Sequence, residues 1–332
     1  LETGHVDFNG DIEVDGCIQD GFKVKGENLK AREILRAEID IAGDITVTGG
    51  IIGASIKSGG GVSALYIHNA HVQSAGDIKV EKEVYSSILE TNNKCNVMRG
   101  RMSSSSVSAK KGIIAGEIGS EAAAPCNLTV GIDTIGHNKV NHIIEQIAVK
   151  KKGQNKLEDL SAGLRQEIKN LDDELERIPQ EEDKARLQQM SLQKSLQECQ
   201  KKGDVLQIEK IEGAIRFLDS KINQVYENMD STLARQEEIQ EEINKHNQEI
   251  KGYRQEIENL KAEANDITEL SKSEKGIAEI RVSGLIHVLT NITAPHSSCT
   301  LSEDRQHVLI SEVKTEEPEQ PSEWKMRISP LK

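Results

Sequence analysis

Aromatic side chains are scarce in this chain of 332 residues, where Phe, Trp and Tyr together make up 2%. An ordinary globular core takes much of its buried area from such rings, so this composition argues against one. The strands of a narrow β-helix face each other closely, and Val, Ile, Ala and Ser fill its interior better than rings do. The scarcity of aromatic residues therefore favours a core of small cross-section.

Other absences exclude further classes of protein. No apolar run approaches the roughly 20 residues that span a bilayer, and no signal peptide is visible. The net charge of −13 argues against binding to a nucleic-acid backbone as the main role. The cysteines lack CxxC or any other metal-ligand spacing, and an odd, scattered set suits a reducing compartment. They are Cys17, Cys95, Cys126, Cys199 and Cys299. These absences favour a protein of a reducing compartment, with no metal site at its cysteines, no membrane span and no nucleic-acid partner.

A repeated triplet is the clearest pattern in the sequence. Gly-Asp-Ile begins at Gly10, Gly43 and Gly76, at a constant interval, and each copy continues as Ile-x-Val. Weaker copies at Gly26 and Gly60 halve this interval, so the true period is about 16–17 residues. A fixed period this short predicts a solenoid, in which each coil of chain stacks on the next.

The repeat predicts a right-handed parallel β-helix over residues 1–137, with about 16–17 residues per coil. Short runs of alternating apolar residues indicate half-buried strands, and Gly-Asp pairs between them indicate tight corners. Acyltransferase hexapeptide helices have coils of about 18 residues, which does not fit this period. The expected coil starts are Gly10, Gly26, Gly43, Gly60, Gly76, Asn93, Lys110 and Asn127. The residues expected to point inward are Ile12, Val14, Phe22, Val24, Ile39, Ile41, Ile45, Val47, Val62, Val72, Ile78, Val80, Val107, Ile113, Leu128 and Val130.

From residue 138 to residue 272 the apolar period changes to alternating steps of 3 and 4, which is typical of a coiled coil. Two arms of nearly equal length, about 139–202 and 205–271, flank Gly203 and predict an antiparallel hairpin that turns there. Asp204 would cap the second helix. Pro179 predicts a kink or a restart in the first helix. Residues whose numbers sum to about 407 should then face each other: Leu196 and Ile211, Leu164 and Ile243, Ile147 and Leu260.

Residues 273–332 return to the strand pattern and predict the final coils and a cap. The Pro-bearing stretch Glu316–Glu323 and Trp324 would close this end, because proline removes a backbone donor and blocks further pairing. Leu1 is not a start Met, so we expect the chain to be a fragment whose first coil has an open edge. Such edges pair with other chains, so a homo-oligomer is expected.

The ordered set of glycine-rich motifs resembles the flagellar assembly protein A (FapA) family. The matching segments are Gly10–Gly16, Asp20–Val24, Gly43–Gly53, Lys111–Ser120 and Leu128–Gly131. The order of solenoid, Val-Gly, long coiled coil and short β end is also similar. The resemblance implies a bacterial, cytoplasmic, non-enzymatic solenoid that is linked to flagellar assembly or cell-pole organisation, and it brings no catalytic motif. Members of that family usually carry a further N-terminal domain.

Several residues could suggest chemistry, and each has a structural explanation. Asp11, Glu27 and Asp44 are expected to stack as an acidic column at one corner, which a polysaccharide lyase would use with calcium, although corner turns alone explain Gly-Asp. His68 and His71 lack a carboxylate or thiol to complete a metal site. Ser103–Ser106 is expected to be a polar turn, because no Gly-x-Ser-x-Gly surrounds it.

Three further histidines have similar structural explanations. His246 at a seam position is expected to set register. His137 and His142 are expected to be solvated near the start of the hairpin. We therefore predict no catalytic, cofactor-binding or metal-binding residues.

The sequence thus predicts a non-enzymatic structural or scaffold protein. It would bind protein partners through the solenoid surface and the coiled coil, whose tip is basic at Lys201 and Lys202. A carbohydrate-active β-helix enzyme of the polysaccharide-lyase type is the alternative.

Overall fold

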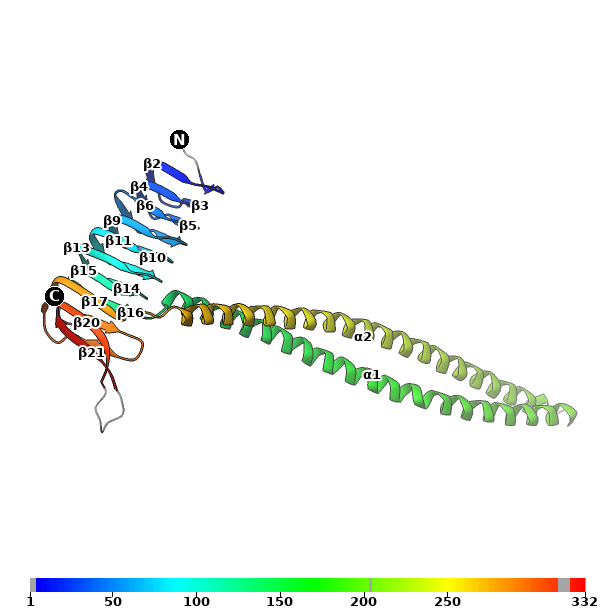
Figure 1. The fold of residues 1–332 in the computed structure, drawn as a ribbon. Helices are drawn as coiled ribbons and strands as arrows, with labels where there is room; N and C mark the ends of the chain where they lie inside the picture. Colours follow the sequence, from blue (N-terminus) through cyan, green and yellow to red (C-terminus); the bar gives the residue numbers. More distant parts are fainter. Residues whose placement is uncertain (1–3, 203–204, 316–322, 332) are drawn as a thin grey trace. The chain divides into compact units, whose positions relative to one another are not determined.

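The computed structural model describes residues 4–202, 205–315 and 323–331. The chain forms two compact units, drawn in Figure 1. Leu1–His142 and Ala264–Lys332 together make the first unit, which contains a β-solenoid. Ile143–Glu263 makes the second unit, which is a hairpin of two long helices.

The strands of the solenoid form two sheets, and the strands of each coil alternate between them. The first sheet has the order β1 (Val6–Asp7), β3 (Lys23–Gly26), β5 (Glu38–Ile41), β8 (Ser55–Ser58), β10 (His71–Ser74), β12 (Ile88–Thr91), β14 (Ser106–Ala109), β16 (Asn127–Val130), β18 (Asn291–Thr293), β19 (Ser298–Thr300). The second has the order β2 (Ile12–Ile18), β4 (Leu29–Leu35), β6 (Ile45–Val47), β9 (Val62–His68), β11 (Ile78–Tyr85), β13 (Cys95–Ser103), β15 (Ile113–Ile118), β17 (Glu279–Ile286), β20 (Arg305–Thr315), β21 (Glu323–Pro330). The short strand β7 (Gly50–Ile52) pairs with β4 and β9.

Consecutive coils are in parallel register at the predicted interval. Ile12 pairs with Leu29, Leu29 with Ile45, and Ile45 with Val62, so each step along the chain equals the period of the repeat. The step is slightly longer between Cys95 and Ile113, which are also register partners. Seven pairs of long and short strands, from β2–β3 to β15–β16, precede the helices. The β-solenoid predicted from the repeat is therefore confirmed.

The core of the solenoid consists of the apolar residues that the alternation predicted to point inward. All of those from Val24 onward are buried. Ile12, Val14 and Phe22, at the first coil, are partly buried and pack against the same core. The interior holds aliphatic side chains with Cys95, Met102 and Cys126 and no fully buried aromatic ring among the described residues. This agrees with the small cross-section that the composition indicated.

The hairpin replaces a corner of the solenoid. Ala109 and Val130 are register partners, and so are Ile113 and Ile280. The chain spans the first corner with three residues, whereas at the second corner it leaves Val130, forms both helices and returns at β17. Asn127, predicted as a coil start, instead begins the second strand of its coil. The prediction was wrong because residues 119–126 lengthen the preceding corner and shift the repeat.

The C-terminal end contains one further parallel coil and then antiparallel strands. β17 and β18 run parallel to β15 and β16. β19, β20 and β21 then pair antiparallel, with β18, β17 and β20 respectively. Trp324 lies in β21 and stacks on His296, with ring centroids 4.5 Å apart. Most of the stretch expected to form a cap, residues 316–322, lies outside the described residues.

The helices α1 (Thr134–Lys202) and α2 (Val205–Ser273) have the predicted antiparallel register. Lys150 bonds Glu256, Ser161 bonds His246 and Gln189 bonds Asp219, and the residue numbers of each pair sum to between 406 and 408. Pro179 lies inside α1, which continues through it, so no restart occurs there. Gly203 and Asp204, the predicted turn and cap, lie outside the described residues.

The buried residues of α2 all belong to the predicted seam: Leu218, Ile222, Val225, Ile239, Ile243, Ile250 and Ile257.

Candidate functional site

The Gly-Asp corner carries a ladder of hydrogen bonds from coil to coil. Asn28 donates through Nδ2 to Asp11 (2.7 Å), and the backbone N–H of Asp44 donates to Asn28 Oδ1 (2.8 Å). The backbone N–H of Gly61 donates in turn to Asp44 Oδ1 (2.7 Å). Asn28, not Glu27, therefore occupies the column between the two aspartates, and the expected acidic column was wrong by one residue at this coil. Asn28 and Asp44 thereby satisfy backbone N–H groups at the corner of the next coil.

The two neighbouring histidines meet different carboxylates. Nε2 of His68 lies 3.0 Å from Glu83, and Nε2 of His71 lies 3.6 Å from Glu90. They belong to different strands, β9 and β10, with a corner at Asn69 (φ 50°) between them. No group of three or more His, Cys, Asp or Glu among the described residues could hold a metal ion.

The serine run forms an internal corner, as expected. Ser105 donates to the carbonyl oxygen of Ser103 (2.8 Å) and accepts from the backbone N–H of Ser87 (3.1 Å). Both Ser103 and Ser105 are buried, and Ser104 has a positive φ of 50°. His137 donates its backbone N–H to the carbonyl of Asp133 in the first turn of α1. His142 also lies in α1.

A buried ion pair lies where the helices leave and rejoin the solenoid. Nζ of Lys110 lies 3.5 Å from Asp133 and donates to the carbonyl oxygen of Ser271 at the end of α2 (3.2 Å). Asp133 also accepts the backbone N–H of Gly136 (2.7 Å), which is the geometry of an N-cap. The sequence pattern does not reveal this cluster, because Lys110 and Ser271 are 161 residues apart.

The second sheet bends where its long strands change register. Between matched flanking pairs, β13 advances four residues from Val97 to Arg101 while β15 advances two, from Ala115 to Glu117. Extra residues on one strand bulge outward and twist it. Met98 and Arg99 fall in this bulge, and Met98 is 53% exposed.

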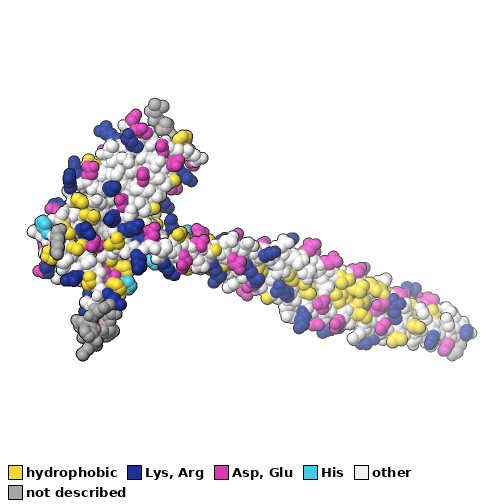
Figure 2. All heavy atoms as spheres, in the orientation of Figure 1, with side chains coloured by type: hydrophobic (Ala, Val, Ile, Leu, Met, Phe, Trp, Pro, Cys, Tyr) yellow, Lys and Arg dark blue, Asp and Glu magenta, His cyan; other side chains and the backbone are white. Residues whose placement is uncertain are grey.

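Two adjoining hollows lie along these bulges, and we call them together the bulge groove. The first, of about 880 Å³, is lined by residues of β6, β9, β11 and β13, from Thr46 to Arg99. The second, of about 600 Å³, continues past β15 to Gly284 on β17. Both are lined by Lys82, Met98 and Arg99. Figure 2 shows Lys and Arg side chains next to apolar ones over the part of the solenoid that carries β11 to β17.

The charges of the bulge groove are only partly neutralised within it. Arg101 pairs with Glu117 at 2.6 Å, and Glu83 pairs with His68. Within residues 4–202, 205–315 and 323–331, Lys82 and Arg99 have no ion-pair partner. Neither residue was predicted as part of a site, although Met98-Arg99-Gly100 interrupts the apolar alternation between Val97 and Met102.

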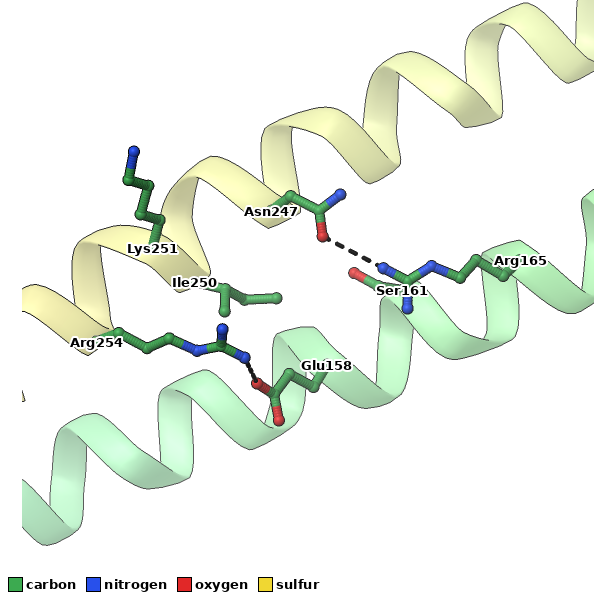
Figure 3. A pocket seen from close by; sticks show the side chains of 7 residues that line it. All are labelled: Glu158, Ser161, Arg165, Asn247, Ile250, Lys251 and Arg254. Carbon is green, nitrogen blue, oxygen red and sulfur yellow. Dashed lines mark hydrogen bonds and ion pairs between the residues drawn. The ribbon is translucent and has the colours of Figure 1, made fainter.

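The hairpin has an opening beside its seam, of about 630 Å³ (Figure 3). Ser161 is almost completely buried at a seam position, and its Oγ lies 3.3 Å from Nδ1 of His246. Arg254 donates to Glu158 (2.9 Å) beside it, and Arg165 donates to Asn247 (3.3 Å).

Hydrogen bonds also favour the ionised form of a carboxyl group beside this opening. Those from Gln154 and Arg254 lower the pKa of the Glu158 carboxyl. A small polar side chain at the seam leaves unfilled volume, and this explains the opening.

All five cysteines are described, and all are free. Burial raises the pKa of Cys95 to about 12 and raises that of Cys126. Cys17 is exposed, but its hydrogen bond to Glu33 raises its pKa. Raised pKa values reduce the thiolate fraction that reacts or binds metal, so these three thiols are poor candidates for chemistry.

In a comparison with protein-family models, the model of the Flagellar Assembly Protein A beta solenoid domain, FapA, matches residues 1–236. The chain belongs to the FapA family. The matched region contains the first seven coils, all of α1 and part of α2. A search of curated proteins found no match, and neither did a search of solved structures.

Membership in the FapA family agrees with the observed β-solenoid. The family is of a non-enzymatic, scaffold type and is connected with flagellar assembly. Among the described helices of this FapA chain, none is long and apolar enough to cross a membrane.

Proposed function

We propose that this chain is a non-enzymatic scaffold in bacterial flagellar assembly or cell-pole organisation, acting in the cytoplasm. The observation that carries the proposal is the match of residues 1–236 to the FapA solenoid domain. A solenoid presents a regular, extended surface whose coils contact mainly their neighbours, which suits binding rather than catalysis.

The hairpin supplies a second surface that supports partner binding. Large apolar side chains are exposed in the first turns of α2. Val205 and Leu206 at its start are 74% and 75% exposed, and Phe217, about three turns further on, is 70% exposed. Lys201, in the last turn of α1, is exposed as well. Exposed apolar side chains of this size with a charged rim are typical of protein–protein contact sites.

Deletion of the gene, followed by complementation in the same bacterium, tests this proposal. We expect the deletion to change the number or position of flagella in electron micrographs, and the wild-type chain to restore them. The double variant Val205→Ser and Leu206→Ser should restore them less well, because it removes the apolar contact without removing the helices. Leu270→Ser, which alters an equally exposed apolar residue far from that end, is the control.

Unchanged flagella in the deletion strain would contradict the proposal. Equal complementation by the double variant and by the control would contradict only the role of the hairpin end.

A further inference from the structure

We propose that the bulge groove binds an extended acidic peptide segment of a protein partner. The inference rests on the proposed function, because it names one contact that such a scaffold would make. The length of the groove, its unpaired cations and its exposed Met98 support this ligand.

The length of the groove fits an extended peptide that runs across the coils. Its lining comes from six successive strands of the second sheet, β6, β9, β11, β13, β15 and β17. Five steps of about 4.8 Å give roughly 24 Å, which an extended chain covers in about seven residues. Gly100, Gly116 and Gly284 line the second hollow and place no side chain in it.

These glycines are required by the fold itself. A Cβ at Gly100 would lie 2.2 Å from the carbonyl oxygen of Lys82, and one at Gly116 would lie 2.6 Å from that of Gly100. Close stacking of the coils therefore keeps this floor free of side chains, and a bound peptide can approach the backbone.

The charges at the middle of the groove indicate an acidic ligand. Lys82 and Arg99 line both hollows, are exposed and have no ion-pair partner within the described ranges. Among the described residues that line the first hollow, Glu81 is the one carboxylate, so two free cations face one acid there. Arg99 can bind a carboxylate through two parallel hydrogen bonds. Met98, which lines both hollows with them, offers an adaptable apolar contact, which favours a ligand with aliphatic residues among its acids.

A binding measurement with the full chain tests the inference. The probe is a fluorescein-labelled peptide of about eight residues that alternates Glu and Leu, matched to the groove by length. The comparison peptide has Lys in place of Glu. We expect fluorescence anisotropy to show saturable binding of the acidic peptide, weakened by salt, and no comparable binding of the basic one.

Charge reversal then locates the site. The variant Lys82→Glu with Arg99→Glu should bind the acidic peptide at least about tenfold more weakly, because two attractive contacts become repulsive. The control, Lys25→Glu with Lys57→Glu, changes the net charge equally through exposed lysines of β3 and β8 in the other sheet. It should keep the wild-type affinity. Thermal unfolding followed by circular dichroism confirms that both variants are folded.

Three results would overturn the inference. They are no preference of the wild type for the acidic peptide, equal weakening in both variants, and loss of self-association in the Lys82/Arg99 variant, which would make a second copy of the chain the occupant. Restoration of flagella by the wild type alongside a negative peptide result would refute the groove and leave the proposed function standing. Unchanged flagella in the deletion strain would refute the function whatever the peptide result.

Discussion

Lys110 and Asp133 form an ion pair whose side chains are only 5% and 8% exposed. Each charge of a buried pair is stabilised by its partner, so removing one side chain leaves the other charge buried without a counter-charge. The surface pairs of this chain differ: Lys30 and Glu13, for example, are 61% and 62% exposed. Exposed pairs contribute about 0–1 kcal/mol. Removing one partner of the buried pair should therefore cost more stability than removing one partner of an exposed pair.

Asp133→Ala should lower the free energy of unfolding by about 3 kcal/mol, because Lys110 would remain buried without its carboxylate. About 1 kcal/mol of this would come from the lost N-cap of α1. Urea denaturation measures it. The control is Asp133→Asn combined with Lys110→Met, which keeps a capping oxygen and removes both charges, and it should cost less. A loss below about 1 kcal/mol in Asp133→Ala would show that the pair does not stabilise the fold.

Cys17 is exposed, yet its thiol should react slowly near pH 8. Its Sγ donates to Oε2 of Glu33 (3.3 Å), and that hydrogen bond raises its pKa. Because the thiolate is the nucleophile, a raised pKa lowers the reactive fraction, and the labelling rate should climb as pH rises toward the shifted pKa. Glu33→Gln should label severalfold faster with iodoacetamide at pH 8, as followed by peptide mass spectrometry. Cys95, buried with a pKa of about 12, should stay unlabelled until the chain unfolds. Equal rates for Cys17 in both proteins would rule out this role of Glu33.

The polar pair at the seam of the hairpin affects a whole element. A polar residue at a core position of a coiled coil fixes register at a cost in stability. Ser161 and His246 meet at such positions, beside the opening in Figure 3. The structure therefore indicates that the hairpin gives up some stability here.

Replacing the pair by Ser161→Ile and His246→Leu should raise the melting temperature of the helical signal at 222 nm. Filling an opening with apolar side chains contributes about 1–2 kcal/mol. The control is Glu176→Leu, an exposed position of α1, which should change little. A lower melting temperature in the double variant would show that the serine–histidine contact stabilises the hairpin directly.

For the whole molecule, the position of the hairpin at a corner predicts that the solenoid folds without it. Val130 and Ile280 are the counterparts of Ala109 and Ile113, which three residues connect. The position that a Cβ would take on Gly131 lies 3.2 Å from the backbone nitrogen of Ala278. Joining Gly131 directly to Ala278 therefore rebuilds a corner of the ordinary length.

Deletion of residues 132–277 should leave a folded, cooperatively melting solenoid, because each coil is stabilised mainly by its neighbours. Circular dichroism should lose the helical signal and keep the strand signal. A deletion longer by one residue, which joins Gly131 to Glu279, shortens the corner and should melt at a lower temperature. Aggregation of both products would show that the helices are needed for the solenoid to fold.

Periodic features could be predicted from the sequence because they repeat many times. A constant coil period places every Ile-x-Val run in the core, and a shift of one residue would turn the whole run to solvent. The seam of the hairpin is specified in the same way by Ile239, Ile243 and Ile250, so the register of the two helices was also predictable. The stability gained from regular burial along many turns exceeds the cost of a single irregular residue. The helix α1 therefore continues through Pro179.

Features that occur once depended on the tertiary structure. Asn28 replaces Glu27 in the corner ladder because the neighbouring coil decides which side chain reaches Asp11. The contact of Lys110 with Asp133 and Ser271 exists because the chain returns to the same corner after two helices. The bulge groove likewise arises from unequal strand lengths in adjacent coils, which bring Lys82 and Arg99 to one surface. Such sites depend on distances between chain segments that no local pattern encodes, so only the stacked coils bring their residues together.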